Sequence, residues 1–151
     1  MKLSTRSRYG VRLMIALAAA GSDKSVFLKD IAASEDISEK YLSLIVIPLR
    51  AAGLIRSIRG ARGGYVLARE PKDISLCDIV EAVEGETCLV NCLKDTAICP
   101  RTPLCPTRDT WAQLSNTIKE AMAAVTLAQL VSGRKAKQDF ARSVSKPIKK
   151  R

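Results

Sequence analysis

One stretch decides the fold: SEKYLSLIVIPLRAAGLIRSIRGARGGYVLA, residues 38–68. Its first half repeats apolar residues at helical spacing and so places four on one face of a helix: Leu42, Ile45, Leu49 and Ala52. Ser38 suits the N-cap of this helix, and Gly53 suits the position just after its end. In the second half, apolar and polar residues alternate before a Gly-rich reversal at residues 60–64, and another short run follows it. This pattern predicts a β-hairpin with arginines at its tip.

Two further helices are expected ahead of this stretch. Residues 4–20 repeat apolar residues at helical spacing, and a second, short helix starts near Leu28 after a segment that could form only a small edge strand. Two helices joined by a short turn and followed by a hairpin predict a winged helix-turn-helix. Pro48 lies inside the third helix, so we expect a kink or a short break near Ile47.

After the hairpin, the sequence predicts a helix, then a Cys-rich stretch without periodicity, and then a second helix. A linker helix is expected from Ser75 to Gly85, and residues 85–106 then hold four cysteines and three prolines without sustained periodicity. A loop of that length without secondary structure needs something to hold it, and cysteine ligation would do so. A long helix from Thr107 then spaces apolar residues by three and four, which fits an ordinary core helix or the seam of a dimer: Trp111, Leu114, Ile118, Ala121 and Val125.

These patterns predict a mainly α fold with a small β-hairpin, made of a winged helix-turn-helix and a long dimerisation helix. Residues 1–70 would form the DNA-binding domain, and residues 71–133 the linker helix, the Cys-rich loop and the dimerisation helix. Residues 134–151 are basic with few apolar residues, so we expect a disordered tail.

Composition and charge narrow the classes of partner. The 151 residues are 47% apolar, enough for a core, but they contain neither an 18-residue apolar run nor a signal-peptide pattern. We therefore expect a cytoplasmic protein without a membrane segment. Residues 1–69 carry a net charge of +7, residues 70–133 carry −4, and residues 134–151 carry +7. Basicity confined to the winged helix and the tail suits a reader of polyanions, although a basic solvated surface would look the same.

The candidate DNA-binding residues occupy three places. The exposed start of the third helix would reach base edges or phosphates through Ser38, Lys40, Tyr41 and Ser43. Arg59 and Arg62 flank the wing tip, where a guanidinium could enter a narrow minor groove, unless both are merely solvated. Arg6 and Arg8, at the start of the first helix, would contact phosphate. The expected partners are double-stranded DNA and a second copy of the chain.

The cysteines form a second signal. The chain has five cysteines and no histidine, and four cysteines crowd into the spacing Cys88-x3-Cys92-x6-Cys99-x5-Cys105. Such crowding in a cytosolic protein favours metal or redox chemistry, and thiolates are the usual ligands of iron–sulfur clusters. Zinc would prefer C-x2-C pairs, which are absent. The same pattern also fits a thiol switch at Cys92, Cys99 and Cys105 or a loop of unused thiols, whereas the isolated Cys77 is expected to be a small buried hydrophobe.

Several stretches together resemble the Rrf-type bacterial winged-helix transcription regulators, the group that includes the iron–sulfur regulator IscR, the nitric-oxide sensor NsrR and the cysteine-metabolism repressor CymR. The matching stretches are MKLSTRSRYGVRLM, ISEKYL, LRAAGLIRSIRGARGGYVLA and the Cys-rich segment ending in CPTRDTWAQL, within residues 1–131. The resemblance implies a winged helix joined to a long dimerisation helix, with any cluster loop between them.

The resemblance also assigns Cys92, Cys99 and Cys105 to a cluster, but the fourth ligand departs from the family. Members that use a histidine or an N-terminal aspartate would need it at Arg108 or Arg8. Cys88 is then the local candidate, ahead of Asp95, Asp109 or a residue of the other subunit, and the choice between [2Fe–2S] and [4Fe–4S] stays open.

Other functional classes find little support. An enzyme would need catalytic groups, but the chain has no histidine, no Gly-rich phosphate loop and no paired-carboxylate pattern, so no small-molecule substrate is expected. An RNA-binding protein would need aromatic residues for stacking, and only 4% are aromatic. A protein–protein adaptor is the third rival. The sequence therefore predicts a dimeric DNA-binding transcription regulator modulated by an iron–sulfur cluster, or the same regulator sensing through a thiol switch or a partner protein.

Overall fold

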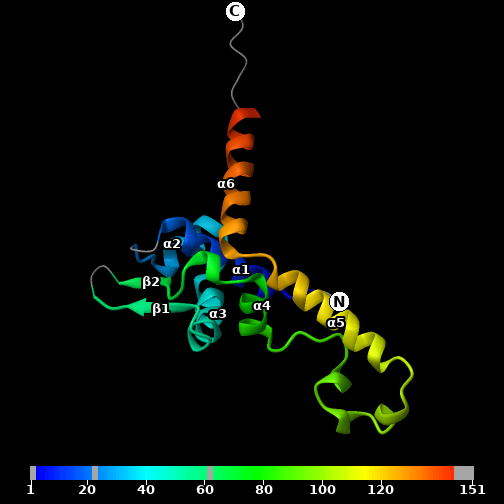
Figure 1. Cartoon of the computed structure of the whole chain (residues 1–151). Coiled ribbons are helices and arrows are strands. Elements are labelled where there is room, and N and C mark those ends of the chain that lie inside the picture. Colours follow the sequence, from blue (N-terminus) through cyan, green and yellow to red (C-terminus); the bar gives the residue numbers. More distant parts are fainter. Residues whose placement is uncertain (1–2, 22–23, 61–62, 145–151) are drawn as a thin grey trace, which may run out of the picture.

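The computed structural model describes residues 3–21, 24–60 and 63–144, with the side chains of the last helix described as far as residue 137. The chain is mainly helical with a single small antiparallel hairpin in this described part, as the sequence predicts (Figure 1). The elements in order are α1 (Thr5–Ala20), α2 (Leu28–Glu35), α3 (Glu39–Ala51), β1 (Ile55–Ile58), β2 (Gly64–Leu67), α4 (Leu76–Glu84), α5 (Arg108–Ala123) and α6 (Leu127–Val144).

The main core lies where α1 packs against α3 and α4. Its fully buried side chains come from the apolar faces that periodicity identifies, among them Leu13 and Leu17 of α1 and Leu42 and Ile45 of α3. Each such burial stabilises the fold by about 1.5–3 kcal/mol. Gly10 lets α4 approach α1 closely, because a Cβ there would lie 3.4 Å from a methyl carbon of Val83.

Helix α3 differs from the expectation in three details. It runs without a break through Pro48, although proline has no N–H to donate to the Leu44 carbonyl oxygen one turn earlier. Ala52, which the sequence places on the apolar face with Leu42, Ile45 and Leu49, is instead the exposed C-cap of the helix. Ser38 holds the N-cap position as predicted, but its side chain makes no capping hydrogen bond.

The hairpin is tied to the segment before α2 by close backbone contacts. β1 pairs with β2 in the register Ile55↔Leu67 to Ile58↔Gly64. Val26 forms an isolated bridge with Tyr65, through N···O distances of 3.0 and 2.9 Å, in place of the expected small edge strand. Gly64 makes this bridge possible, because its φ is 131° and a Cβ there would lie 2.6 Å from the Val26 carbonyl oxygen.

Helices α4 and α5 form a second, smaller unit of packing. The first turn of α4 is closed by a reciprocal capping box between Ser75 and Asp78, as the sequence suggests. Met122 of α5 packs with Cys77 and Val80 of α4. Residues 85–106, expected to lack secondary structure, instead contain three 3-10 helices of three residues each: Asn91–Leu93, Thr96–Ile98 and Thr102–Leu104.

Helix α6 overturns the expectation for the start of the tail. The helix begins at the buried Leu127, whose amide donates to the Ile74 carbonyl oxygen at 2.8 Å, and it continues to Val144. Residues 134–144 are therefore helical and not disordered, whereas residues 145–151 lie outside the described residues. Alanine, lysine, arginine and glutamine, which are good helix formers, explain the continuation past Gly133. No helix in the described ranges is long and apolar enough to cross a membrane.

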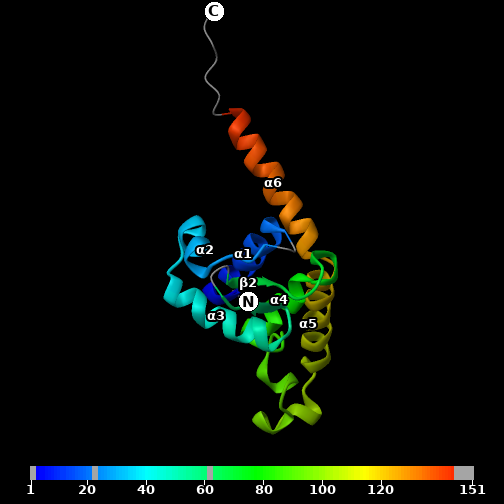
Figure 2. The same ribbon diagram turned by 90° about the vertical axis from the view of Figure 1, so that its left-hand side faces the viewer.

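Two views fix how these parts are arranged. The hairpin lies on one side of the core formed by α1, α3 and α4, and α6 extends away from this core (Figures 1 and 2). The Cys-rich loop lies at the far end of α5. The parts expected to read DNA and the parts expected to sense a signal thus occupy separate regions of one chain.

Candidate nucleic-acid interface and cysteine loop

The start of α3 presents three of its four predicted residues to solvent. Ser38, Lys40 and Ser43 are exposed, and the Ser43 hydroxyl donates to the Lys40 carbonyl oxygen at 2.7 Å, which leaves its oxygen free to accept. Tyr41 differs, because it is half-buried and stands edge-on to Tyr9, with ring centroids 5.6 Å apart. Its ring therefore supports the contact between α1 and α3.

The start of α1 lies beside α3, and both of its predicted arginines are exposed. Arg6 lines a shallow groove together with Tyr41, while the Arg8 guanidinium donates to the Thr5 hydroxyl at 3.1 Å. The first turn is anchored to the end of α4, because the Glu84 carboxylate accepts from the Ser4 amide at 3.2 Å and from nearby serine hydroxyls.

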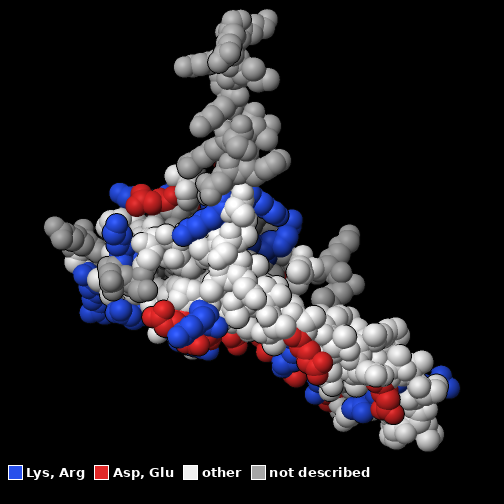
Figure 3. Space-filling view, turned by 45° about the horizontal axis from the view of Figure 1, so that its top comes forward, with Lys and Arg blue, Asp and Glu red and all other residues white. Residues whose placement is uncertain are grey.

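The wing supplies the second basic element. Arg59 follows β1 directly and is exposed, whereas Arg62 lies outside the described residues. The structure adds Arg56, an exposed residue of β1 that the sequence reasoning passed over. Figure 3 shows Lys and Arg side chains both on the side that carries the hairpin and around the base of α6, with some acidic side chains beside them, and a mixture of the two along α5 and the loop.

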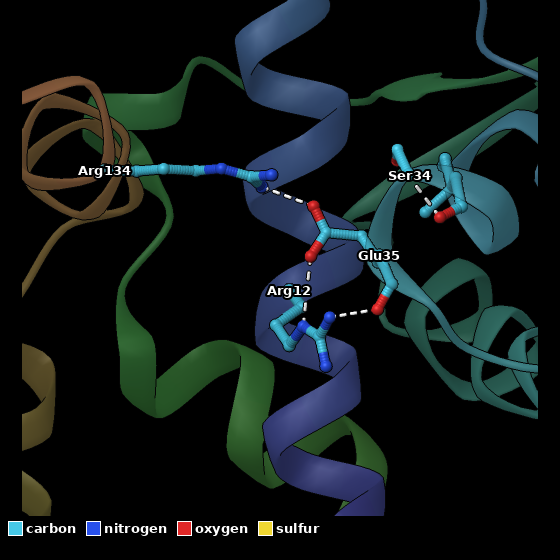
Figure 4. A network of polar contacts seen from close by, with 5 residues as sticks. Arg12, Ser34, Glu35 and Arg134 are labelled. Carbon is cyan, nitrogen blue, oxygen red and sulfur yellow. Dashed lines mark hydrogen bonds and ion pairs between the residues drawn. The ribbon is translucent and has the colours of Figure 1, made fainter. Parts of the chain in front are cut away.

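A buried ion-pair network fixes the turn between α2 and α3, and the sequence reasoning missed it. Glu35 is 6% exposed and its carboxylate lies between two arginines (Figure 4). Arg12 of α1 donates to Glu35 Oε2 at 3.0 Å and also to the Glu35 carbonyl oxygen. Arg134 of α6 lies 2.5 Å from Glu35 Oε1, an ion pair without hydrogen-bond geometry. The network therefore connects α1, α6 and the helix-turn-helix.

The four loop cysteines are half-buried thiols that the structure does not gather into one site. All of them are free, and the Cys88 thiol donates to the Val90 carbonyl oxygen at 3.4 Å. Cys99 and Cys105 line one open cavity of about 610 Å³, but neither Cys88 nor Cys92 lines it. In the described ranges, no three Cys, His, Asp or Glu side chains are placed to hold one metal ion. The loop as folded here therefore does not present the ligand set that a cluster needs.

Two of the cysteines differ in acidity for clear physical reasons. The pKa of the Cys105 thiol is lowered, first by the Thr107 hydroxyl 3.4 Å from its sulfur and then by backbone amides that favour the thiolate. The pKa of Cys77 is raised, first by burial and then by the negative charge of Glu81. Cys105 is thus the more acidic of the two thiols, and Cys77 is buried, as its isolation in the sequence predicts.

Helix α5 leaves part of its apolar stripe uncovered. Ile118 and Met122 pack against α4, whereas Trp111 and Leu114 are 39% and 44% exposed. Ala121 is also exposed. The stripe expected for a single seam is therefore divided between the chain's own core and a surface that the same chain leaves open.

Comparisons with known proteins show which family the chain is similar to. Residues 3–133 match the Rrf2 family, described as an iron-dependent transcriptional regulator. Protein rrf2 of Nitratidesulfovibrio vulgaris is 42% identical over 131 residues, which are 87% of each chain.

Two solved structures agree in fold. One is CymR, described as the global cysteine regulator of Bacillus subtilis, with a TM-score of 0.71 and 40% identity, covering 87% of this chain and 97% of CymR. The other is IscR of T. potens, with a TM-score of 0.70 and 35% identity, covering 91% of both chains. These relatives are transcription regulators and not enzymes. The chain accordingly belongs to the Rrf2 family of winged-helix transcription regulators.

Proposed function

We propose that this chain is a homodimeric, cytoplasmic transcription regulator that reads a two-fold-related site on double-stranded DNA, and that the state of its Cys-rich loop modulates its binding. One observation carries the DNA-reading half. The exposed Lys40 and Ser43 lie on α3, directly after the turn that the Glu35 network anchors, and the exposed Arg59 lies on a hairpin tied to the same body. A recognition helix and a basic wing on one frame can enter adjacent grooves of a duplex.

The proposed dimer seam is the open face of α5. Trp111 and Leu114 expose apolar surface three residues apart on a 16-residue helix, and this surface lacks a partner within the described part of the chain. Two copies pairing through this face would bury both stripes. A dimer would also present two recognition helices, as a two-fold-related site requires.

The first candidate for the sensed group is an iron–sulfur cluster, either [2Fe–2S] or [4Fe–4S]. Its proposed ligands are Cys92, Cys99 and Cys105, with Cys88 as the fourth thiolate. Because these thiols do not form a ligand set in this structure, cluster binding requires residues 85–106 to reorder. That requirement gives the proposal a structural consequence, since the loop joins α4, next to the winged helix, to α5.

The second candidate is a thiol switch, and two observations favour it. Cys105 has a lowered pKa and Cys99 lines the same cavity. A peroxide would oxidise the Cys105 thiolate to a sulfenic acid, and condensation with the Cys99 thiol would release water and leave a disulfide. The bond would constrain the same loop without any metal.

DNA reading is tested by gel mobility shift with fragments selected from the genome of the source bacterium. We expect specific binding whose affinity falls with salt. We expect Arg59→Ala to lower the salt slope by about 0.9 for one lost phosphate contact, or to change preference at an A·T-rich position. Failure of every fragment to compete better than random DNA would remove the function.

The sensing half is tested by anaerobic purification, followed by an absorption spectrum and iron and sulfide analysis. A coloured protein with both elements, lost together in Cys92→Ser, supports the cluster. A colourless protein after reconstitution, in which peroxide protects Cys99 and Cys105 from alkylation until a reductant is added, supports the thiol switch. A protein with neither property would remove both candidates.

A further inference from the structure

Two aliphatic side chains stand out on the solvent face of α3. Leu44 is 55% exposed and Ile47 is 58% exposed, whereas the apolar residues on the opposite face are almost fully buried. Leu44 and Ile47 follow Lys40 by four and seven residues, so all three share one face of the helix. The face that carries the proposed DNA contacts thus carries apolar side chains as well.

These side chains border a groove whose lining is mainly apolar, with Arg6 as its one charged residue. The groove has a volume of about 390 Å³ and is lined by Arg6, Tyr41, Leu44, Ile45, Ile47 and Pro48. Lys40 and Arg50 are exposed on the same helix, and the one carboxylate of α3, Glu39, lies in its first turn. Exposed basic residues on the same helix as exposed apolar side chains suit a polyanion that offers apolar groups of its own.

The major groove of DNA offers this combination. Phosphates form its edges, and the 5-methyl groups of thymines are the apolar part of its floor. We propose that Leu44, with Ile47 beside it, contacts thymine 5-methyl groups and makes this regulator select thymine at defined positions of its site. The inference rests on the proposed function and extends it from phosphate contacts to the reading of bases.

A second copy of the chain is the other possible occupant of this face. Its winged helix would bring a net charge of +7 against an identical charge and would cover Lys40 together with Leu44. The open stripe of α5 offers an apolar seam without that repulsion. Charge complementarity therefore favours DNA.

The test needs a binding site and one chemical change. A site is selected from a random-sequence pool, and duplexes are made in which each thymine in turn is replaced by deoxyuridine, which removes only the 5-methyl group. We expect at least one replacement in each half-site to weaken wild-type binding about fourfold, the effect of one buried methyl-sized group. We expect the same replacement to have no effect on Leu44→Ala. Leu104→Ala is the matched control, because Leu104 is 90% exposed in the Cys-rich loop, and it should keep the wild-type response.

The outcomes distinguish failure of this inference from failure of the proposed DNA-binding function. If no sequence is enriched from the pool, the proposed function itself fails. If a site is found but no deoxyuridine duplex binds wild type more weakly, the inference fails alone, and the wild-type series shows this without any variant. It also fails if Leu44→Ala, with its fold checked by circular dichroism, loses as much affinity as the wild type when thymine is replaced by deoxyuridine. Conversion of the dimer to a monomer by Leu44→Ala in sedimentation would assign the face to a second copy and overturn the inference.

Discussion

Replacement of Arg134 by alanine removes one of the two guanidinium groups around the buried Glu35 carboxylate. The perturbed contact is the 2.5 Å approach of Arg134 Nη1 to Glu35 Oε1, which joins α6 to the turn of the helix-turn-helix. Arg12 remains in place, 3.0 Å from Glu35 Oε2. The Glu35 carboxylate therefore keeps its contact with Arg12 and loses its ion pair with α6.

The structure sets the size of the effect. Removal of one partner of a fully buried ion pair costs about 3–5 kcal/mol, because the other charge stays buried without compensation. Glu35 is 6% exposed, but the Arg134 side chain is 32% exposed and Arg12 continues to neutralise the carboxylate. Solvent screening and the second arginine reduce the expected loss to about 1–2 kcal/mol of unfolding free energy. For a chain of this size the midpoint of thermal unfolding would fall by roughly 2–8 °C.

The assay is thermal and urea unfolding of four proteins at one protomer concentration, since the stability of a dimer depends on concentration. They are the wild type, Arg134→Ala, Glu35→Gln and the double variant. In the Glu35→Gln background, Arg134→Ala should cost little, because the charge it neutralised is gone. Lys137→Ala is the control, because it removes one exposed positive charge from the same helix and should stay within about 0.5 kcal/mol of wild type.

Two results would refute this reasoning. Arg134→Ala with wild-type stability would mean that α6 is not held to the helix-turn-helix by this ion pair. Equal losses from Arg134→Ala in both backgrounds would mean that the arginine acts through packing or helix propensity and not through Glu35.

The other predictions concern stability at low pH, the reactivity of two thiols and the dimer interface. Hydrogen bonds from Ser4, the N-cap of α1, and from Ser7 hold the pKa of Glu84 below its usual value. The stabilisation by Glu84 is therefore present above about pH 4.5 and is lost as the pH falls through the lowered value. Glu84→Gln should therefore flatten the acid limb of unfolding free energy against pH, and parallel curves would contradict this. Cys105 should be alkylated by iodoacetamide faster than Cys77 at pH 7.5, measured by peptide mass spectrometry, and equal rates would contradict the pKa assignments. Trp111→Glu should place a charge in the α5 seam and shift sedimentation from dimer to monomer, and an unchanged dimer would place the seam elsewhere.

Local patterns predicted the elements of the winged helix because those patterns have local causes. The apolar spacing in residues 38–52 predicts α3, and the glycines after Ile58 predict the hairpin. Pro48 shows the limit of such reasoning, because α3 continues through it to Ala51 although proline removes one helical hydrogen bond. Where a helix ends depends on contacts that spacing alone does not reveal.

The features that sequence could not give depend on residues far apart in the chain. Glu35 looks like a surface residue of a short helix, and only its meeting with Arg12 and Arg134 explains its burial. Periodicity identified α5, but it could not tell that Ile118 is covered by α4 while Trp111 is left open. The spacing of cysteines suggested a ligand set, but spacing does not fix whether the thiols of a long loop meet.

In the proposed mode of binding, two recognition helices and two wings of one dimer read a two-fold-related DNA site. Hydroxyl-radical footprinting on a selected site tests it most directly. We expect two symmetric protected regions on one face of the duplex, with centres about 10–10.5 base pairs or a multiple of that apart. Both regions should weaken together in Lys40→Ala and Arg59→Ala. A single protected region, or protection that neither substitution changes, would contradict it.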